Sequence, residues 1–341
     1  TLTPEIKTYD EANKNVKARS ATNVYSPQAR ADTTINSLHN TQVAITGSGS
    51  HSVTIGSSGT LGNNGNNNKI IYVHTNGNNT LTLTNLTNNG TINGKVAIQN
   101  NRGGFIGTIA VNAFENTGQV NGQIYMGIWS SSSGTLNIDN FNNSGTITAS
   151  NGQGTVFFEG NANIQTFNNS GTITASNNNK GVYFRGNGTI QTFNNSGAIT
   201  AKSEGINLSG ISNIDSFTNS GLISANKAIF ASTSGSNNLT IKNLSNSETG
   251  TINGRVAIEN SSGNFTGTIA VNTFENKGQI NGQIYMGIWG NNSGALSIDK
   301  FDNSGTITTS NGQGVFFEGR NTNIKTFNNN NNGLISGSEG V

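Results

Sequence analysis

The chain contains no cysteine, and only 10% of its 341 residues are charged, so several classes of function are disfavoured from the start. Without cysteine there are no disulfides, no thiolate nucleophile and no cysteine-ligated metal. The 18 basic and 16 acidic residues leave a formal net charge of +2. This balance provides neither the basic footprint of a nucleic-acid-binding protein nor an acidic tail, so we expect no nucleic-acid partner.

Long apolar runs and catalytic motifs are also missing. No apolar run approaches the roughly 18 residues of a membrane-spanning helix, so no membrane span is expected in this chain. The three histidines, His39, His51 and His74, have no acidic partners at metal-ligand spacing. Acidic residues are sparse and recur in equivalent places, such as Glu159 and Glu318, which indicates surface charges rather than catalytic groups. We expect no catalytic residue, no metal and no cofactor.

A repeat dominates what is present, and it is typified by Ile138 to Ile147, Ile-Asp-Asn-Phe-Asn-Asn-Ser-Gly-Thr-Ile. Its anchor positions are always large and apolar: Leu86, Phe114, Phe141, Phe167, Phe193, Phe217, Leu244, Phe274, Phe301 and Phe327, at intervals of 24 to 30 residues. Three residues before each anchor lies Leu, Ile or Val. Two residues after each anchor lies an asparagine: Asn88, Asn116, Asn143, Asn169, Asn195, Asn219, Asn246, Asn276, Asn303 and Asn329.

A fixed period of this length indicates stacked supersecondary units. Each period holds short β-rich runs broken by Asn-Gly and Ser-Gly turns, and no run has the apolar spacing of a helix. The sequence therefore predicts an all-β, single-stranded, right-handed parallel β-helix (β-solenoid) with about 26 residues per coil. Phe and Ile columns should fill its interior, the asparagines should form an amide ladder, and glycine should supply positive φ at tight corners.

The chain divides into three parts. Residues 1–40 carry both prolines and much of the charge, and we expect an N-terminal cap or tail there. Residues 41–85 should form irregular first coils, and residues 86–341 regular coils, truncated at the C-terminus. Within the regular part a block of six coils is duplicated at an offset of 160 residues, so any surface feature should appear twice, about 29 Å apart.

Two aromatic pairs are the candidate ligand-binding residues. Tyr125 and Trp129 recur as Tyr285 and Trp289. Strand alternation places these aromatics opposite Ile124, Met126 and Ile128, so they face water if the aliphatic side is the interior. Exposed aromatics suit sugar stacking or contact with another protein. The alternative is a local bend that places Trp129 in the core.

The rungs, typified by Phe141-Asn142-Asn143-Ser144-Gly145-Thr146-Ile147, resemble those of bacterial type V autotransporter passenger domains, in particular adhesin-like members, over residues 41 to 341. The resemblance implies export through the inner and outer membranes by a C-terminal β-barrel and display at the cell surface. It also implies adhesion, autoaggregation or, in some members, proteolysis. The chain lacks the Gly-Asp-Ser-Gly motif of the protease members, which disfavours protease activity.

The favoured hypothesis is a non-enzymatic surface rod, an adhesin or autoaggregation factor with a role in virulence. Its partners would be a glycan or protein on a host or neighbouring cell, with self-association possible. The alternatives are a polysaccharide-acting β-helix enzyme, recognisable by several convergent carboxylates, and a self-stacking filament or surface-layer subunit. The 26-residue step also predicts that Glu159 and Arg185 lie on adjacent coils and face each other.

Overall fold

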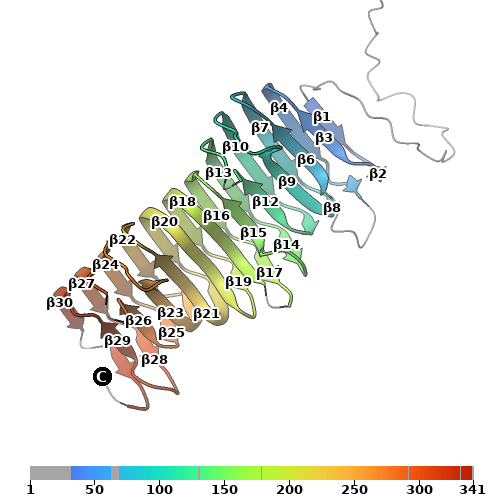
Figure 1. The fold of residues 1–341 in the computed structure, drawn as a ribbon. Coiled ribbons are helices and arrows are strands. Elements are labelled where there is room, and N and C mark those ends of the chain that lie inside the picture. The colour runs from blue at the N-terminus through green and yellow to red at the C-terminus, as the bar shows by residue number, and fades with distance from the viewer. Residues whose placement is uncertain are drawn as a thin grey trace, which may run out of the picture.

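The chain folds as one all-β parallel solenoid of about 11 coils with about 27 residues per coil (Figure 1). The computed structural model describes residues 32–62, 69–129, 131–177, 179–290, 292–330 and 332–339. No helix occurs among these residues. Each coil has three sides, and each strand pairs in parallel with the strand on the same side of the next coil. The predicted fold class is confirmed.

The first side carries the anchor and asparagine columns. Its strands are β1 (Asp32–Ile35), β4 (Gly49–Ile55), β7 (Thr80–Asn88), β10 (Thr108–Asn116), β13 (Thr135–Asn143), β16 (Ala162–Asn169), the later parts of β18 (Lys180–Asn195) and β20 (Glu204–Asn219), β22 (Leu239–Asn246), β24 (Thr268–Asn276), β27 (Ala295–Asn303) and β30 (Thr322–Asn329). The second side is shorter. Its strands are β2 (Leu38–His39), β5 (Thr60–Leu61), β8 (Thr91–Asn93), β11 (Gln119–Asn121), β14 (Thr146–Ala149), β17 (Thr172–Ala175), β19 (Ala198–Thr200), the first parts of β21 (Leu222–Thr233) and β23 (Thr251–Asn260), β25 (Gln279–Asn281), β28 (Thr306–Thr308) and β31 (Leu334–Ser336).

The third side positions the candidate site. Its strands are β3 (Val43–Thr46), β6 (Lys69–Thr75), β9 (Lys95–Asn100), β12 (Ile124–Gly127), β15 (Gly154–Glu159), the first parts of β18 and β20, the later parts of β21 and β23, β26 (Ile284–Gly287) and β29 (Val315–Glu318). In β18 and β20 the third side runs into the first without a break, whereas other coils have a loop at this corner.

The predicted columns occur in the predicted register. Phe141 pairs with Phe114 on one side and with Phe167 on the other, and Phe167 pairs with Phe193. The rings of Phe167 and Phe193 stack with their centroids 4.5 Å apart and their planes 6° apart. Ile138 and Phe141 are both buried although they are three residues apart, because the two residues between them, Asp139 and Asn140, are both on the outside. A dry interior of stacked side chains therefore runs through the described coils.

The asparagine column forms the predicted amide ladder. Asn143 Nδ2 donates to Asn169 Oδ1 at 2.7 Å, and Asn169 Nδ2 donates to Asn195 Oδ1 at 2.7 Å. The same bond recurs on every step from Asn88 to Asn329. These side chains are buried except Asn329, and their amides satisfy one another along the rod.

Glycine has a different role from the expected one at the corner after each asparagine. Gly145 and Gly171 do not have positive φ. A Cβ on Gly145 would lie 2.1 Å from the carbonyl oxygen of Gly118 in the preceding coil, so close stacking of successive turns requires glycine there. Positive φ occurs instead at the corner between the third and first sides, for example at Gly160 and Gly186.

The pairing register shifts in the N-terminal coils, as it also does between β18 and β20 and between β21 and β23. The expected cap or tail at residues 1–40 lies mostly outside the described residues, but β1 and β2 pair in parallel with β4 and β5. Paired strands therefore begin at Asp32, ahead of the boundary placed at residue 40. The register shifts once between His51 and Ser52 and once between Lys69 and Ile71.

Candidate functional site

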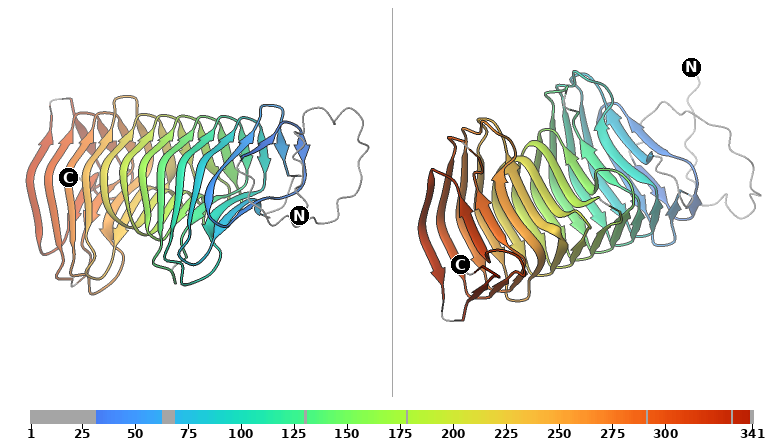
Figure 2. Two further views of the ribbon diagram at one scale, coloured as in Figure 1. Left: turned by 90° about the horizontal axis from the view of Figure 1, so that it is seen from above. Right: turned by 60° about the horizontal axis from the view of Figure 1, so that its bottom comes forward.

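The duplicated block produces two protrusions at the corner between the third and first sides. The first ridge comprises residues 101–107 and the described part of 128–134, and the second comprises 261–267 and the described part of 288–294. Figure 2 shows both as long loops that extend beyond the coils between them. The ridges are six coils apart, which corresponds to about 29 Å along the rod.

A buried phenylalanine packs at the base of each ridge. Phe105 and Phe265 are fully buried, and each lies against a glycine of the next loop, Gly134 or Gly294, where a Cβ would be 2.3 Å from the ring. The Phe105 amide donates to Ser132 Oγ at 3.1 Å, and that of Phe265 to Asn292 Oδ1 at 2.8 Å. These contacts make each pair of loops a packed unit.

The two tryptophans lie on the ridges, each 38% exposed. Asn100 Oδ1 accepts a hydrogen bond from the Trp129 backbone amide at 2.9 Å, and Asn260 Oδ1 accepts the same bond from Trp289. The indole Nε1 of Trp289 also donates to the Asn260 carbonyl oxygen at 2.5 Å. The backbone amide of each tryptophan is therefore held by an asparagine, while part of the indole ring is exposed to solvent. The alternative that Trp129 lies in the core is wrong.

The two tyrosines point away from the aliphatic interior, as strand alternation predicts, but they do not face water. Tyr125 and Tyr285 are 5% and 4% exposed. Tyr125 packs in a second apolar cluster with Ala97, Phe157 and Tyr183 on the outer surface of the third side. The expectation of water-facing tyrosines is wrong because side chains from neighbouring coils cover them.

These tyrosines belong to an outer aromatic column in which like positions stack from coil to coil. Its members are Tyr72, Tyr125, Phe157, Tyr183, Phe230, Tyr285 and Phe316, interrupted by Ala97, Asn207 and Ala257. Phe157 and Tyr183 stack with centroids 4.8 Å apart. Cations lie over several of these rings, which adds a charged layer outside the aromatic one.

Tyr125 and Tyr285 each donate a hydrogen bond to a glutamate of the next coil. Tyr125 Oη lies 2.8 Å from Glu159 Oε2, and Tyr285 Oη lies 2.6 Å from Glu318 Oε2. Burial, followed by the bond to Glu159, raises the pKa of Tyr125 far above its ordinary value, so the phenol remains a donor at neutral pH. The side chain of Glu159 is 13% exposed, so this charge at the outer face is largely covered by its partners.

Sequence reasoning missed the glycines that make this bond possible. Gly127 lies in register with Glu159, and a Cβ on Gly127 would be 2.7 Å from the Tyr125 hydroxyl oxygen. Gly287 has the same relation to Tyr285. The repeated Tyr-Met-Gly could have pointed to these glycines. Their role, however, depends on a glutamate more than 30 positions later in the chain.

The predicted contact between Glu159 and Arg185 is confirmed. The two residues pair in register on adjacent coils, and Arg185 Nη2 forms an ion pair with Glu159 Oε1. Arg185 Nη1 also donates to Gln153 Oε1 at 2.9 Å. Glu159 thus holds a tyrosine and an arginine at once.

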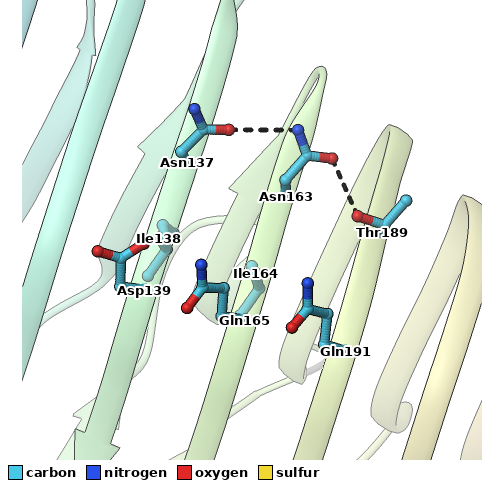
Figure 3. A pocket seen from close by; sticks show the side chains of 8 residues that line it. All are labelled: Asn137, Ile138, Asp139, Asn163, Ile164, Gln165, Thr189 and Gln191. Atoms are coloured by element: carbon cyan, nitrogen blue, oxygen red, sulfur yellow. Dashed lines mark hydrogen bonds between the residues drawn. The ribbon is translucent and has the colours of Figure 1, made fainter.

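A pocket on the first side begins a few residues beyond the first ridge (Figure 3). It is lined by polar side chains from three successive coils, including Asp139, Asn163 and Gln191. Asn163 Nδ2 donates to Asn137 Oδ1 at 3.2 Å, and Thr189 donates to Asn163 Oδ1 at 3.0 Å. Asp139 is the one carboxylate in its lining.

The described part of the chain contains no cluster of three potential metal ligands. It also contains no helix long and apolar enough to cross a membrane. No protein-family model matches the sequence, and neither a curated protein nor a solved structure was found to be similar to it. The class that the fold defines is a parallel β-solenoid repeat protein.

Proposed function

We propose that the chain is a non-enzymatic adhesive rod, part of an autotransporter-type passenger domain exported through the inner and outer membranes and displayed on a bacterial cell. Its ridges would bind a glycan or protein on a host or neighbouring cell. The supporting observation is that a half-exposed tryptophan, fixed by a buried asparagine, occurs on both ridges. Rigid amphipathic aromatics of this kind are effective contact residues at low entropic cost.

The spacing of the ridges supports a multivalent ligand. A repetitive glycan or a layer of clustered receptors can contact Trp129 and Trp289 at once, whereas a monovalent ligand gains nothing from the second copy. The coils between the ridges include β18 and β20, which pass the corner without a loop. The two copies of the ridge therefore increase the avidity of the rod for a multivalent ligand.

Cell adhesion of the purified chain, immobilised on beads, tests the proposal. Trp129→Ala and Trp289→Ala should each weaken adhesion modestly, and the double variant should weaken it by more than the product of the two fold-changes. Leu38→Ala is the matched control because Leu38 is 64% exposed and lies off both ridges. Unchanged adhesion of a correctly folded double variant would overturn the proposal.

A further inference from the structure

The outer face of the third side carries the same pair of cations twice. Lys69 and Lys95 pair in register on adjacent coils, and Lys227 and Arg255 do so near the second ridge. In parallel pairing the two residues of each pair are about 4.8 Å apart at the backbone. Each cation lies over an aromatic ring, at 3.9 Å for Lys69 on Tyr72, 4.6 Å for Lys95 on Tyr125, 4.1 Å for Lys227 on Phe230 and 4.4 Å for Arg255 on Tyr285.

The two pairs differ in one residue. Glu259 lies between the cations of the second pair, with Oε1 4.0 Å from Lys227 Nζ and Oε2 4.0 Å from Arg255 Nη2. The equivalent residue of the first pair is the neutral Gln99, which occupies the same register position, next to Gly127 as Glu259 is next to Gly287. Glu259 therefore offsets one of the two positive charges of the second pair, whereas the neutral Gln99 offsets none in the first.

No other carboxylate replaces Glu259 in the first pair among the described residues. Glu159 is the acidic residue that acts on Lys95, and it already accepts bonds from Tyr125 and Arg185. Burial lowers the pKa of Lys69, and burial followed by repulsion from Lys69 lowers that of Lys95. By contrast, Lys180 on the same side lies 3.5 Å from Glu204.

We infer that Lys69 and Lys95 together form a binding site for the acidic group of a polysaccharide, a carboxylate or a sulfate, at the outer face of the third side. Two ammonium groups on a rigid face provide a site for one anion, and the second pair shows a carboxylate held in this way. The Tyr72 ring beside the site has Lys69 over it at 3.9 Å and His74 stacked on it at 4.2 Å, so it holds the Lys69 ammonium group in place.

This inference rests on the proposed function, which it deepens by naming acidic polysaccharides as a ligand class. The site lies on the side that leads into the first ridge, because β9 ends at Asn100, which accepts the Trp129 amide bond. A polymer bound at Lys69 and Lys95 can therefore continue toward Trp129. The net charge of +2 provides no extended phosphate-binding footprint, so a nucleic acid is disfavoured.

Binding of dextran sulfate and of polygalacturonate, measured at a fixed low ionic strength, tests the site and distinguishes sulfate from carboxylate. Gln99→Glu should weaken binding at least about tenfold, because it places a carboxylate where the second pair has one. Glu259→Gln should do the reverse and add a second site per chain. Circular dichroism checks that both variants fold, since Gln99 is 2% exposed and donates to the Asn100 carbonyl oxygen at 3.2 Å.

Gln119→Glu is the matched control because it adds the same charge at an exposed position on the second side. Equal affinities of the Gln99→Glu and Gln119→Glu variants, or no binding of either polymer by the parent chain, would overturn the site. The tryptophan variants keep the two proposals separable. If they lose adhesion while Gln99→Glu binds dextran sulfate normally, the anion site alone is wrong; if the converse holds, the ridges are not the adhesive contact.

Discussion

The Tyr125 hydroxyl passes over Gly127 to donate a hydrogen bond to Glu159 on the next coil, with 2.8 Å between the oxygens. Three residues from two coils thus form a single unit on the outer face. The same unit recurs as Tyr285, Gly287 and Glu318.

Gly127→Ala should therefore destabilise the rod by about 1 to 3 kcal/mol, because overpacking forces the tyrosine off its bond. The new Cβ would be 2.7 Å from Tyr125 Oη and 3.0 Å from Glu159 Cβ. Denaturant titration measures the change. The matched control is Gly263→Ala, since Gly263 has nothing within 4 Å of the added Cβ and lacks a positive φ, and an unchanged midpoint is expected.

Phe167→Ala should cost about 3 to 5 kcal/mol because it opens a cavity between two stacked rings. Phe167 is fully buried, with the rings of Phe141 and Phe193 at 4.8 and 4.5 Å. Phe327→Ala should cost clearly less because Phe327 is 40% exposed and stacks on Phe301 from one side. Equal midpoint shifts for the two variants would contradict the stacked interior.

Asn169→Ala should cost about 1 to 3 kcal/mol for each partner left without its bond, because both neighbouring amides are buried. Asn329→Ala is the comparison, since its side chain is exposed and water replaces the lost bonds. Thermal unfolding of both variants measures the difference. A smaller effect at Asn169 than at Asn329 would refute the ladder as a source of stability.

Stability should fall as the pH rises through the titration of Glu259. Burial, opposed by Lys227 and Arg255, raises the pKa of this carboxyl above its ordinary value of 4.5. The folded chain then holds the proton more tightly than the unfolded chain, so stability is lost between pH 4.5 and the higher folded-state pKa. Urea midpoints across this window should vary less in Glu259→Gln, and an identical pH profile in both proteins would show that Glu259 does not titrate in this way.

Iodide should quench both tryptophans. Each is 38% exposed, so emission should lie between that of a core indole and that of free tryptophan. Trp289→Phe isolates Trp129 and should leave a single accessible population. A blue-shifted, unquenched spectrum would place the indoles in the interior and remove the ridges as the adhesive contact.

The coil and its pairing register could be predicted from the sequence, because equivalent positions of successive repeats lie next to each other in the structure. The spacing of Phe157 and Tyr183 implied the pairing of Glu159 with Arg185, and the columns implied the interior. Alternation along β12 likewise indicated which way Tyr125 points. Local sequence patterns predict contacts correctly wherever like side chains occupy equivalent positions in successive coils.

The burial of Tyr125 could not be predicted in this way. Alternation gives the direction of a side chain but not what lies beyond it, and the groups that cover Tyr125 come from Lys95 and Phe157 on the neighbouring coils. The ridges were also missed, since each seven-residue loop lies in an interval of 27 to 30 residues between anchors, close to the 26 residues of coils without such a loop. Their two-fold occurrence could be predicted, but their packing on Phe105 could not.

The amide ladder has a direction. Each Nδ2 from Asn88 to Asn303 donates toward the coil that follows it in the chain, so the amide dipoles are aligned along the axis and polarise one another. Loss of one amide in the middle of the ladder should therefore weaken the bonds on both sides of it as well as removing its own two bonds, because each remaining bond loses a polarising neighbour.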